Sequence, residues 1–358
     1  MRGPNEIDFW RGLALIMIFI DHVPGIIFEN YTYRNFGISD AAEVFVFLAG
    51  WSLRLVVASA RKTQSPLRIT LRLEARALKI YIAQIFITSI ALAITATGAL
   101  YFKDSLVLDW NNAAVIFENP VEAQLGIVLL SHQLGYFDIL PLYVVLMAAA
   151  PLIVLVDRIS GWLLLALSIT IYVLTLWSGV NIPTWPVEGR WFFNPLAWQL
   201  VFVLGFLIAS PDGIAALAHR HRRVLRWLAL PVVAYSAWLA QIGWSPDPLA
   251  VPEPRLFFMF DKTFVSPAKL IHLLCAVAFI SGFFATIHLW FRSLTQFCSM
   301  LGRNSLNVFC AASVLSLGSQ FARYSYGSGF AADSAVLGFG LMIMGGTAWL
   351  SEWSERIR

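Results

Sequence analysis

Residues Asp8 to Gly25 read DFWRGLALIMIFIDHVPG, and this stretch determines both the fold class and the first functional hypothesis. Most of its side chains are apolar, and a membrane-spanning helix needs about 20 such residues. The stretch nevertheless carries Arg11, Asp21 and His22. Because charge is costly inside a bilayer, ionisable residues at this depth predict a functional site.

The composition of the whole chain places it in a membrane. Of its 358 residues, 59% are hydrophobic and 13% are charged, whereas soluble domains have about 25% charged residues. No aqueous segment is long enough to fold alone, so we expect one membrane-embedded domain over residues 1–358. The formal net charge of +4 therefore does not indicate a nucleic-acid partner. The three cysteines match no zinc or redox spacing, and no metal is expected.

Apolar segments along the chain predict an all-α, polytopic membrane helix bundle of about ten transmembrane helices. The expected spans are residues 9–28, 41–60, 80–98, 138–156, 161–178, 195–210, 224–242, 269–290, 304–321 and 334–351. Of the two longest connections, 99–137 contains an ambiguous apolar stretch at 123–130 that is compatible with a re-entrant segment. The other, 243–268, is rich in proline and indicates an irregular loop.

Basic residues are unevenly distributed between alternate connections, and they predict the orientation. Lys and Arg concentrate in the 54–79 connection and in the 211–226 loop. By the positive-inside rule, this side of the membrane is cytoplasmic. Both termini then face the cytoplasm, which agrees with an even number of spans. The opposite side carries long loops with Trp, Asn, Asp and Glu, which suit a polar or sugar ligand.

Arg11 and His22 share one face of the first helix. They are eleven residues apart, which is about 20° past three full turns and roughly 16 Å along the axis. Asp8 precedes Arg11 by three residues, a spacing that permits an ion pair near the cytoplasmic surface. His22 then lies in the outer half of the membrane.

The second span begins SDAAEVFVFLAGW and brings further carboxylates to the outer side. Glu43 enters at the depth of His22, so a helix hairpin would let its carboxylate orient the imidazole as a general base requires. Asp21 is the second candidate partner. Asp138 stands at the outer mouth of the fourth span, in YFDILPLY, and is a further catalytic candidate.

Several blocks of the sequence resemble the OpgC protein family of alphaproteobacteria. They are IDFWRGLALIMIFIDHVPG, RNFGISDAAEVFVFLAGWSLRL, FDILPLY, WFFNPLAWQLVFVLGFL and LGRNSLNVFC, and together they cover nearly the whole chain. The resemblance implies a multi-pass succinyltransferase of the bacterial inner membrane that modifies osmoregulated periplasmic glucans with succinyl-CoA from the cytoplasm. Arg11 and His22 are also similar to the Arg-x10-His motif of integral-membrane O-acyltransferases. That likeness implies a catalytic role for His22 and an essential one for Arg11.

The residues and the resemblance together predict a mechanism. His22 removes the proton of a glucosyl hydroxyl as it attacks the thioester. Arg11, with Asp8 beside it, lies on the side from which acyl-CoA enters and is assigned to donor binding, because CoA phosphates need cationic partners. Candidate substrate-binding residues are Asn194 or Arg190 for the oxyanion, and Arg34 or Arg190 for the extra carboxylate of a succinyl group. Direct transfer and a covalent acyl intermediate both remain open.

Two other functions fit parts of the pattern. A related enzyme would use acetyl-CoA and O-acetylate another extracytoplasmic polysaccharide. A proton-coupled membrane transporter would also use intramembrane His, Asp and Glu. Release of CoA discriminates between them, because a transporter moves solute without consuming a thioester.

Overall fold

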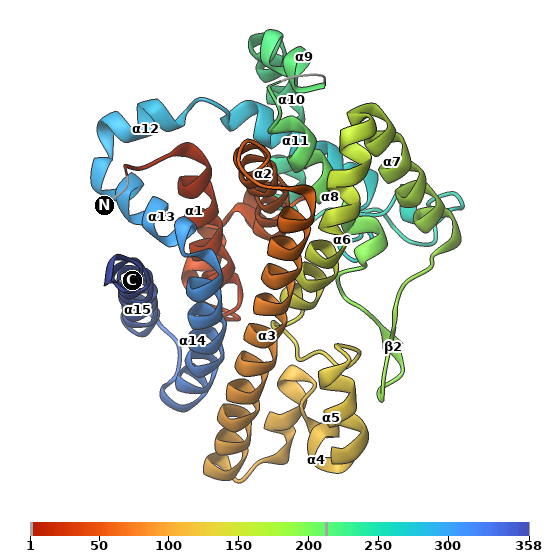
Figure 1. Ribbon diagram of the computed structural model, residues 1–358. Helices are drawn as coiled ribbons and strands as arrows, with labels where there is room; N and C mark the ends of the chain where they lie inside the picture. Colours follow the sequence, from red (N-terminus) through yellow and green to blue (C-terminus); the bar gives the residue numbers. More distant parts are fainter. Residues whose placement is uncertain (1–2, 212–213, 358) are drawn as a thin grey trace.

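The computed structural model describes residues 3–211 and 214–357, and helices account for most of them (Figure 1). The all-α fold class is confirmed, apart from one antiparallel pair of two-residue strands, β1 (Pro183–Thr184) and β2 (Gly189–Arg190). The longer helices are α1 (Glu6–Asp21), α2 (Ala41–Ala60), α3 (Pro66–Phe102), α6 (Ile139–Ile159), α7 (Gly161–Ser178), α8 (Pro195–Ile208), α10 (Arg222–Gln241), α11 (Pro267–Ile280), α13 (Arg292–Arg303), α14 (Ser305–Tyr326) and α15 (Phe330–Ile357).

Among the described residues, six helices are long and apolar enough to cross a membrane: α2, α3, α6, α7, α14 and α15. A seventh span results if α11 and α12 (Phe284–Trp290), which are bent by 54° at a short break, cross together. The chain is therefore a polytopic membrane protein. The other three expected spans correspond to α1, α8 and α10; α1 has 16 residues and α8 has 14.

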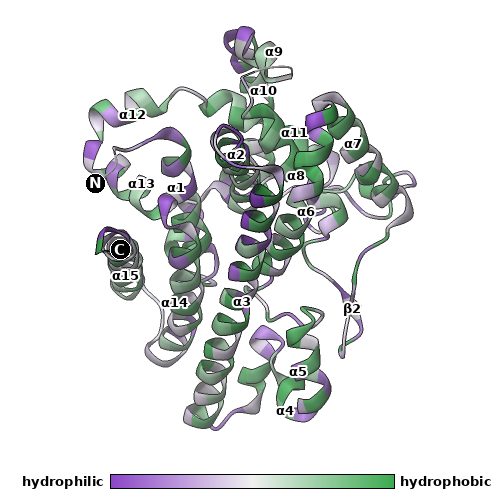
Figure 2. Ribbon diagram, viewed as in Figure 1, coloured by the Kyte–Doolittle hydropathy of each residue, from purple (hydrophilic) through white to green (hydrophobic). Residues whose placement is uncertain are grey.

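Helix α3 is longer than its apolar segment. Ser65 caps it, Pro66 occupies its first turn, and 37 residues follow as one helix, which gives a length of roughly 55 Å. Figure 2 shows hydrophilic residues concentrated in its first half and hydrophobic residues in its second half. The basic 66–79 segment, which we expected to be a connection, therefore extends the helix; Ile69, Leu73 and Ala77 face the bundle, and the basic side chains are exposed.

Close helix packing depends on glycine at two crossings. A Cβ at Gly12 of α1 would overlap the carbonyl oxygen of Cys298, and one at Gly302 of α13 would overlap that of Asp8. Helices α2 and α8 approach in the same way through Gly50 and Gly205. Small residues let helix backbones approach closely in membranes, where the hydrophobic effect contributes little between helices. These crossings hold α1 and α2 rigidly in the bundle.

The two ends of the chain meet at one end of the bundle. Arg303 pairs with Glu352 near the end of α15, at 2.8 Å, and its guanidinium also approaches the Gly3 carbonyl oxygen. The hydroxyl of Ser299 donates to the carbonyl oxygen of Asn5. The described residues near the two ends of the chain therefore lie next to each other.

The connection between α3 and α6 is structured. It forms a 3₁₀ segment, η3 (Ser105–Asn111), and the short helices α4 (Ala114–Glu118) and α5 (Pro120–Val128), seen beside the lower half of α3 in Figure 1. The ambiguous apolar stretch falls largely within α5, whose nine residues are too short to enter and leave a bilayer. The Ser131 hydroxyl donates to the Trp185 carbonyl oxygen and joins this region to the β1–β2 hairpin. The proline-rich 243–268 loop is irregular apart from the 3₁₀ turn η4 (Arg255–Phe257) and the first residues of α11.

Candidate functional site

A cavity of about 660 Å³ lies at the end of α1 that carries His22, and we call it the histidine cavity. Its walls come from the end of α1, the segment before α2, the first turns of α2 and α6, and the two segments around Phe193 and Lys262. The ionisable side chains that line it are Asp21, His22, Arg34, Asp40, Asp138, Lys262 and Lys269, and the aromatic ones are Tyr136, Phe192, Phe193 and Phe260. An apolar wall with a few convergent polar groups is typical of ligand sites.

His22 is positioned by its backbone. It caps the C-terminus of α1, its N–H donates to the Ile18 carbonyl oxygen at 3.1 Å, and its own carbonyl accepts from Gln320 at 2.8 Å. Its ring lies against Tyr136, with 5.0 Å between ring centroids. Within the described part of the chain, neither ring nitrogen has a hydrogen-bond partner. The imidazole is therefore held in place while its nitrogens stay available to a substrate.

Tyr136 supports the interpretation of this cavity as a functional site. Its φ of 68° is left-handed, a conformation that costs a non-glycine residue of order 1–3 kcal/mol. Such strain concentrates at active sites and ligand clamps.

Two of the predicted catalytic carboxylates line the same cavity as His22. The Asp21 carboxylate accepts a 2.7 Å hydrogen bond from the Thr32 hydroxyl. Asp138 stands at the N-terminus of α6 without a side-chain capping hydrogen bond. The cavity thus brings Asp138 of α6 together with Asp21 and His22, which are neighbours at the end of α1 and distant from Asp138 in sequence.

The expected contact between Glu43 and His22 is not formed within the described residues. The Glu43 carboxylate is fully buried, accepts from the Asp40 backbone N–H in a capping box, and pairs with Lys269 at 3.1 Å. Lys269 also donates to the Ile38 carbonyl oxygen at 2.6 Å. Glu43 does not contact His22 because its carboxylate caps the first turn of α2, whose N–H groups are otherwise free. Lys269 also provides a closer charge partner than the imidazole.

Asp40 and Lys262 form an ion pair at the wall of the cavity, with 2.5 Å between oxygen and nitrogen. Burial raises the pKa of the Asp40 carboxyl, but Lys262, the hydrogen bond with Glu43 and the charge of Lys269 together lower it more, so the net pKa lies below its usual range. Burial lowers the pKa of Lys262, but the carboxylates of Asp40, Glu43 and Asp138 together outweigh that effect and raise it. Both groups are therefore charged at neutral pH.

The three predicted substrate-binding residues lie in different places. Arg34 lines the histidine cavity, and its guanidinium has no hydrogen bond or ion pair with any described residue. Arg190 is exposed on β2 and donates to the Gly179 carbonyl oxygen at 3.0 Å. Asn194 is fully buried; it caps α8 and donates to the Val180 carbonyl oxygen. Arg190 and Asn194 are thus outside the cavity, because strand pairing and helix capping use them.

A second cavity, of about 260 Å³, surrounds Arg11, and we call it the arginine cavity. The Arg11 side chain is buried and donates to the hydroxyls of Ser305 at 2.6 Å and Ser52 at 3.2 Å. The Nε–H has no partner, and no carboxylate of the described residues forms an ion pair with the guanidinium. A buried cation without an ion-pair partner is costly, so a bound anion would stabilise Arg11 in this cavity.

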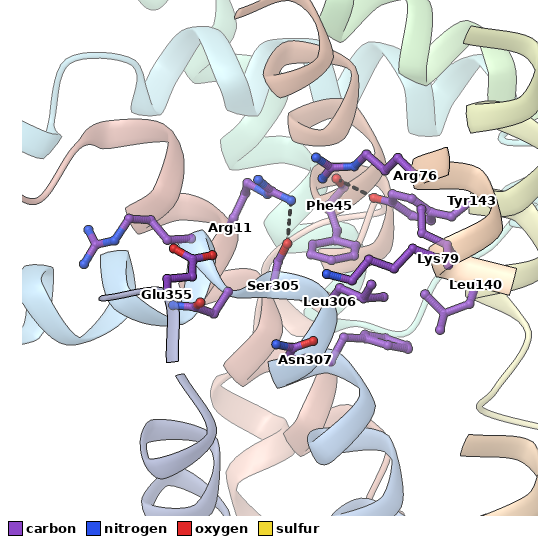
Figure 3. Close-up of a pocket in the computed structure, with 14 residues that line it drawn as sticks. Arg11, Phe45, Arg76, Lys79, Leu140, Tyr143, Ser305, Leu306, Asn307 and Glu355 are labelled. Atoms are coloured by element: carbon purple, nitrogen blue, oxygen red, sulfur yellow. Dashed lines mark hydrogen bonds between the residues drawn. The ribbon is translucent and has the colours of Figure 1, made fainter. Parts of the chain in front are cut away.

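Three further cations line this cavity: Arg303, which pairs with Glu352, and Arg76 and Lys79. Arg76 and Lys79 of α3 point toward Ser305 and Phe45 from the side opposite Arg11 (Figure 3). Neither forms a hydrogen bond or ion pair with another described side chain, and the charges of Arg11 and Arg76 repel each other. Three cations that form no ion pair with the described residues are therefore held near one another, and Glu355 is the acidic residue that lines the same cavity.

The arginine cavity shares Arg11, Arg76 and Ser305 with a larger hollow of about 1070 Å³, which is also lined by the start of α1, by α2 and by the end of α15. Asp8 lines this hollow, but it does not form the expected ion pair with Arg11. Its carboxylate accepts a 2.5 Å hydrogen bond from Asn5, and its backbone N–H donates to the Asn5 side chain. The N-cap of α1 therefore determines the position of Asp8.

One helical turn separates the two cavities. On α2, Ala42 lines the histidine cavity and Phe45 the arginine cavity. On α6, Ile139 lines the first, and Leu140 and Tyr143 line the second. The Tyr143 hydroxyl donates to the Phe45 carbonyl oxygen at 2.9 Å and so joins α6 to α2 between the two cavities. We call Phe45 and Tyr143 the partition.

Sequence reasoning missed Arg76, Lys79 and Lys262. The first two belong to the basic run that served as the topology signal; their three-residue spacing on one helix face was the available clue. Lys262 belongs to an irregular loop, and no sequence signal predicts that it reaches Asp40. Among the described residues, no group of three or more His, Cys, Asp or Glu is arranged to hold a metal ion.

The fold and the two cavities define a polytopic helical membrane protein with an ionisable site at each end of its first helix. The chain matches the family model described as OpgC protein over residues 4–356, and it therefore belongs to the OpgC family. Membership implies a membrane acyltransferase that acts on glucan. No curated protein and no solved structure matches the chain.

Proposed function

We propose that this protein transfers a succinyl group from cytoplasmic succinyl-CoA to hydroxyls of periplasmic glucans in the bacterial inner membrane. The observation that carries the proposal is the pair of cavities at opposite ends of α1, one cationic around Arg11 and one around His22. The donor is made inside the cell and the acceptor is found outside, so the reaction needs an access route from each side.

The arginine cavity receives the donor. Arg11, Arg76 and Lys79 supply charge-assisted hydrogen bonds to CoA phosphates, which are stronger than neutral ones. The orientation that puts this cavity on the cytoplasmic side is supported by the basic residues at the start of α3 and by the chain ends that meet there. From Arg11 to His22 is roughly 16 Å along α1, a separation that the extended pantetheine arm of CoA bridges once the partition of Phe45 and Tyr143 gives way.

The histidine cavity receives the sugar. His22 takes the proton of a glucosyl hydroxyl as its oxygen attacks the acyl carbonyl, since a sugar hydroxyl is far too weak an acid to ionise unaided. Asp21 and Asp138 stabilise the imidazolium electrostatically. Lys262 stabilises the oxyanion, because it lines the cavity and Asn194 and Arg190 do not.

Arg34 distinguishes succinyl from acetyl donors in this scheme. Its guanidinium lines the histidine cavity without an ion-pair partner among the described residues, so it is available for the distal carboxylate of a succinyl group. If the acyl group is acetyl and the acceptor another polysaccharide, Arg34 has no such role, and its removal leaves donor choice unchanged.

The test is release of free CoA from purified protein in nanodiscs, with succinyl-CoA or acetyl-CoA and with or without a periplasmic β-glucan. Glucan-dependent release from succinyl-CoA supports the proposal. Release from acetyl-CoA alone retains the enzyme class and rejects the succinyl donor. No release from folded protein with either donor rejects the enzyme function and favours a transporter.

A further inference from the structure

Ser39 lines the histidine cavity, and behind it lies a second histidine, His272, with which it is paired. The Ser39 hydroxyl oxygen lies 2.7 Å from Nδ1 of His272, and the Ser39 backbone N–H donates to the same nitrogen at 3.2 Å. Because a backbone N–H can only donate, Nδ1 is an acceptor and the ring proton is on Nε2. The Ser39 hydroxyl therefore also donates to Nδ1, which is the arrangement of a nucleophile and its base.

The pair is held rigidly and kept from water. His272 is fully buried, its Nε2 has no partner within the described residues, and its ring stacks on Tyr33 at 5.7 Å. The Tyr33 hydroxyl lies 2.9 Å from the Ser39 oxygen. Gly37 packs so closely on the imidazole that a Cβ there would overlap the ring. Tyr33 is therefore placed to donate to the serine oxygen while His272 accepts its proton.

The serine of this pair also lines the cavity that contains His22. Gly37, Ile38 and Ser39 line the histidine cavity together with His22. One turn before His272 on α11, Lys269 binds the Ile38 carbonyl oxygen and so fixes the backbone beside Ser39. A thioester carbonyl that reaches His22 enters the cavity whose wall contains Ser39.

We propose that Ser39 carries the acyl group as an ester between the two halves of the reaction, with His272 as its base. This inference rests on the proposed acyl-CoA function. In the first half, the Ser39 oxygen attacks the thioester carbonyl and gives its proton to Nδ1 of His272. The carbon–sulfur bond breaks, and the CoA thiolate takes that proton as it leaves. In the second half, a sugar hydroxyl gives its proton to His22 and attacks the ester, and the Ser39 oxygen leaves and takes the proton from His22.

Two histidines then have separate tasks, which explains why both adjoin one cavity. His272 cannot serve the sugar, because it is buried behind Ser39 and Tyr33. His22 has open ring nitrogens and no serine partner among the described residues. In the competing scheme, acyl transfer from CoA to sugar is direct and the Ser39–His272 pair only fastens the segment before α2.

The experiment is acyl-enzyme trapping. The full-length protein in nanodiscs is incubated with isotope-labelled succinyl-CoA without glucan, quenched in acid and mapped by peptide mass spectrometry. The inference predicts one succinyl group on Ser39. His22→Ala retains the label, because only the second half is blocked. His272→Gln lowers the labelling rate by about 10²–10⁴-fold, the usual contribution of a general base.

Ser39→Cys keeps the test decisive even where Ser39→Ala fails to fold, because a cysteine in the same place still accepts the acyl group and the label then survives as a thioester. Glucan-dependent CoA release without label on Ser39, or with label on His22, overturns the inference and leaves the proposed function standing. If no donor gives CoA release, both the acyl-Ser39 inference and the proposed function are rejected.

Discussion

Replacing Arg11 by alanine gives the sharpest test of the arginine cavity. Arg11 is buried, contacts only the hydroxyls of Ser52 and Ser305, and has no carboxylate partner in the described structure. If it binds a donor phosphate, Arg11→Ala loses a charge-assisted hydrogen bond of about 1.5–3 kcal/mol. At about 1.4 kcal/mol per factor of ten, KM for the acyl donor rises about 10- to 150-fold.

The stability of the same variant separates binding from a structural role. An unpaired buried charge is a cost to the folded state, so removing it leaves the unfolding temperature unchanged or raises it. A structural arginine predicts the reverse: a lower unfolding temperature and an unchanged donor KM. The donor KM is measured from initial rates against succinyl-CoA, and the affinity for free CoA is measured by calorimetry. The unfolding temperature is measured by thermal unfolding in nanodiscs. Arg222→Ala, an exposed arginine at the start of α10, is the matched control.

The reasoning is refuted if Arg11→Ala binds CoA within about twofold of the wild type. Arg11→Lys gives a graded check. A lysine keeps the charge, but it lacks the fork that spans Ser52 and Ser305. We expect its donor KM to lie between those of the wild type and Arg11→Ala.

Three further predictions follow from other contacts. Arg34→Gln reduces the preference for succinyl-CoA over acetyl-CoA by about tenfold or more, measured as the ratio of kcat/KM values, because one charge-assisted bond to the distal carboxylate is lost; an unchanged ratio contradicts this role. Lys262→Met leaves Asp40 without its ion-pair partner and lowers kcat by about 10²-fold through the lost oxyanion contact; a change in KM alone contradicts it. Gly205→Val places side-chain atoms against the Phe47 backbone and destabilises the fold by about 1–3 kcal/mol, which thermal unfolding in detergent checks; an unchanged unfolding temperature contradicts the packing argument.

The sequence predicts helices best where caps and apolar length coincide. The expected spans 41–60 and 161–178 match α2 and α7 as the structure has them, because Asp40 and Ser160 cap them directly before a long apolar run. The start of α3 was predicted late, since its first turns are basic and only its second half is apolar. Helix α13 was not expected, because it is amphipathic and its apolar side chains do not form a continuous apolar segment.

The candidate site was predictable in part. Residue type and spacing identified Arg11 and His22 as the two ends of one helix face, and the structure gives each its own cavity. The partner of Glu43 was not predictable, because Lys269 comes from a helix 226 residues later in the chain. Short-range patterns carry no information about such a contact.

The account's central claim is that His22 removes the proton of the acceptor. The most direct test is glucan-dependent release of free CoA from succinyl-CoA by wild type and His22→Ala in nanodiscs, with His221→Ala, an exposed histidine in the turn before α10, as the matched control. The account predicts that His22→Ala loses about 10²–10⁴-fold in rate while the control keeps the wild-type rate and both variants fold. Glucan-dependent release by folded His22→Ala at the wild-type rate would contradict it.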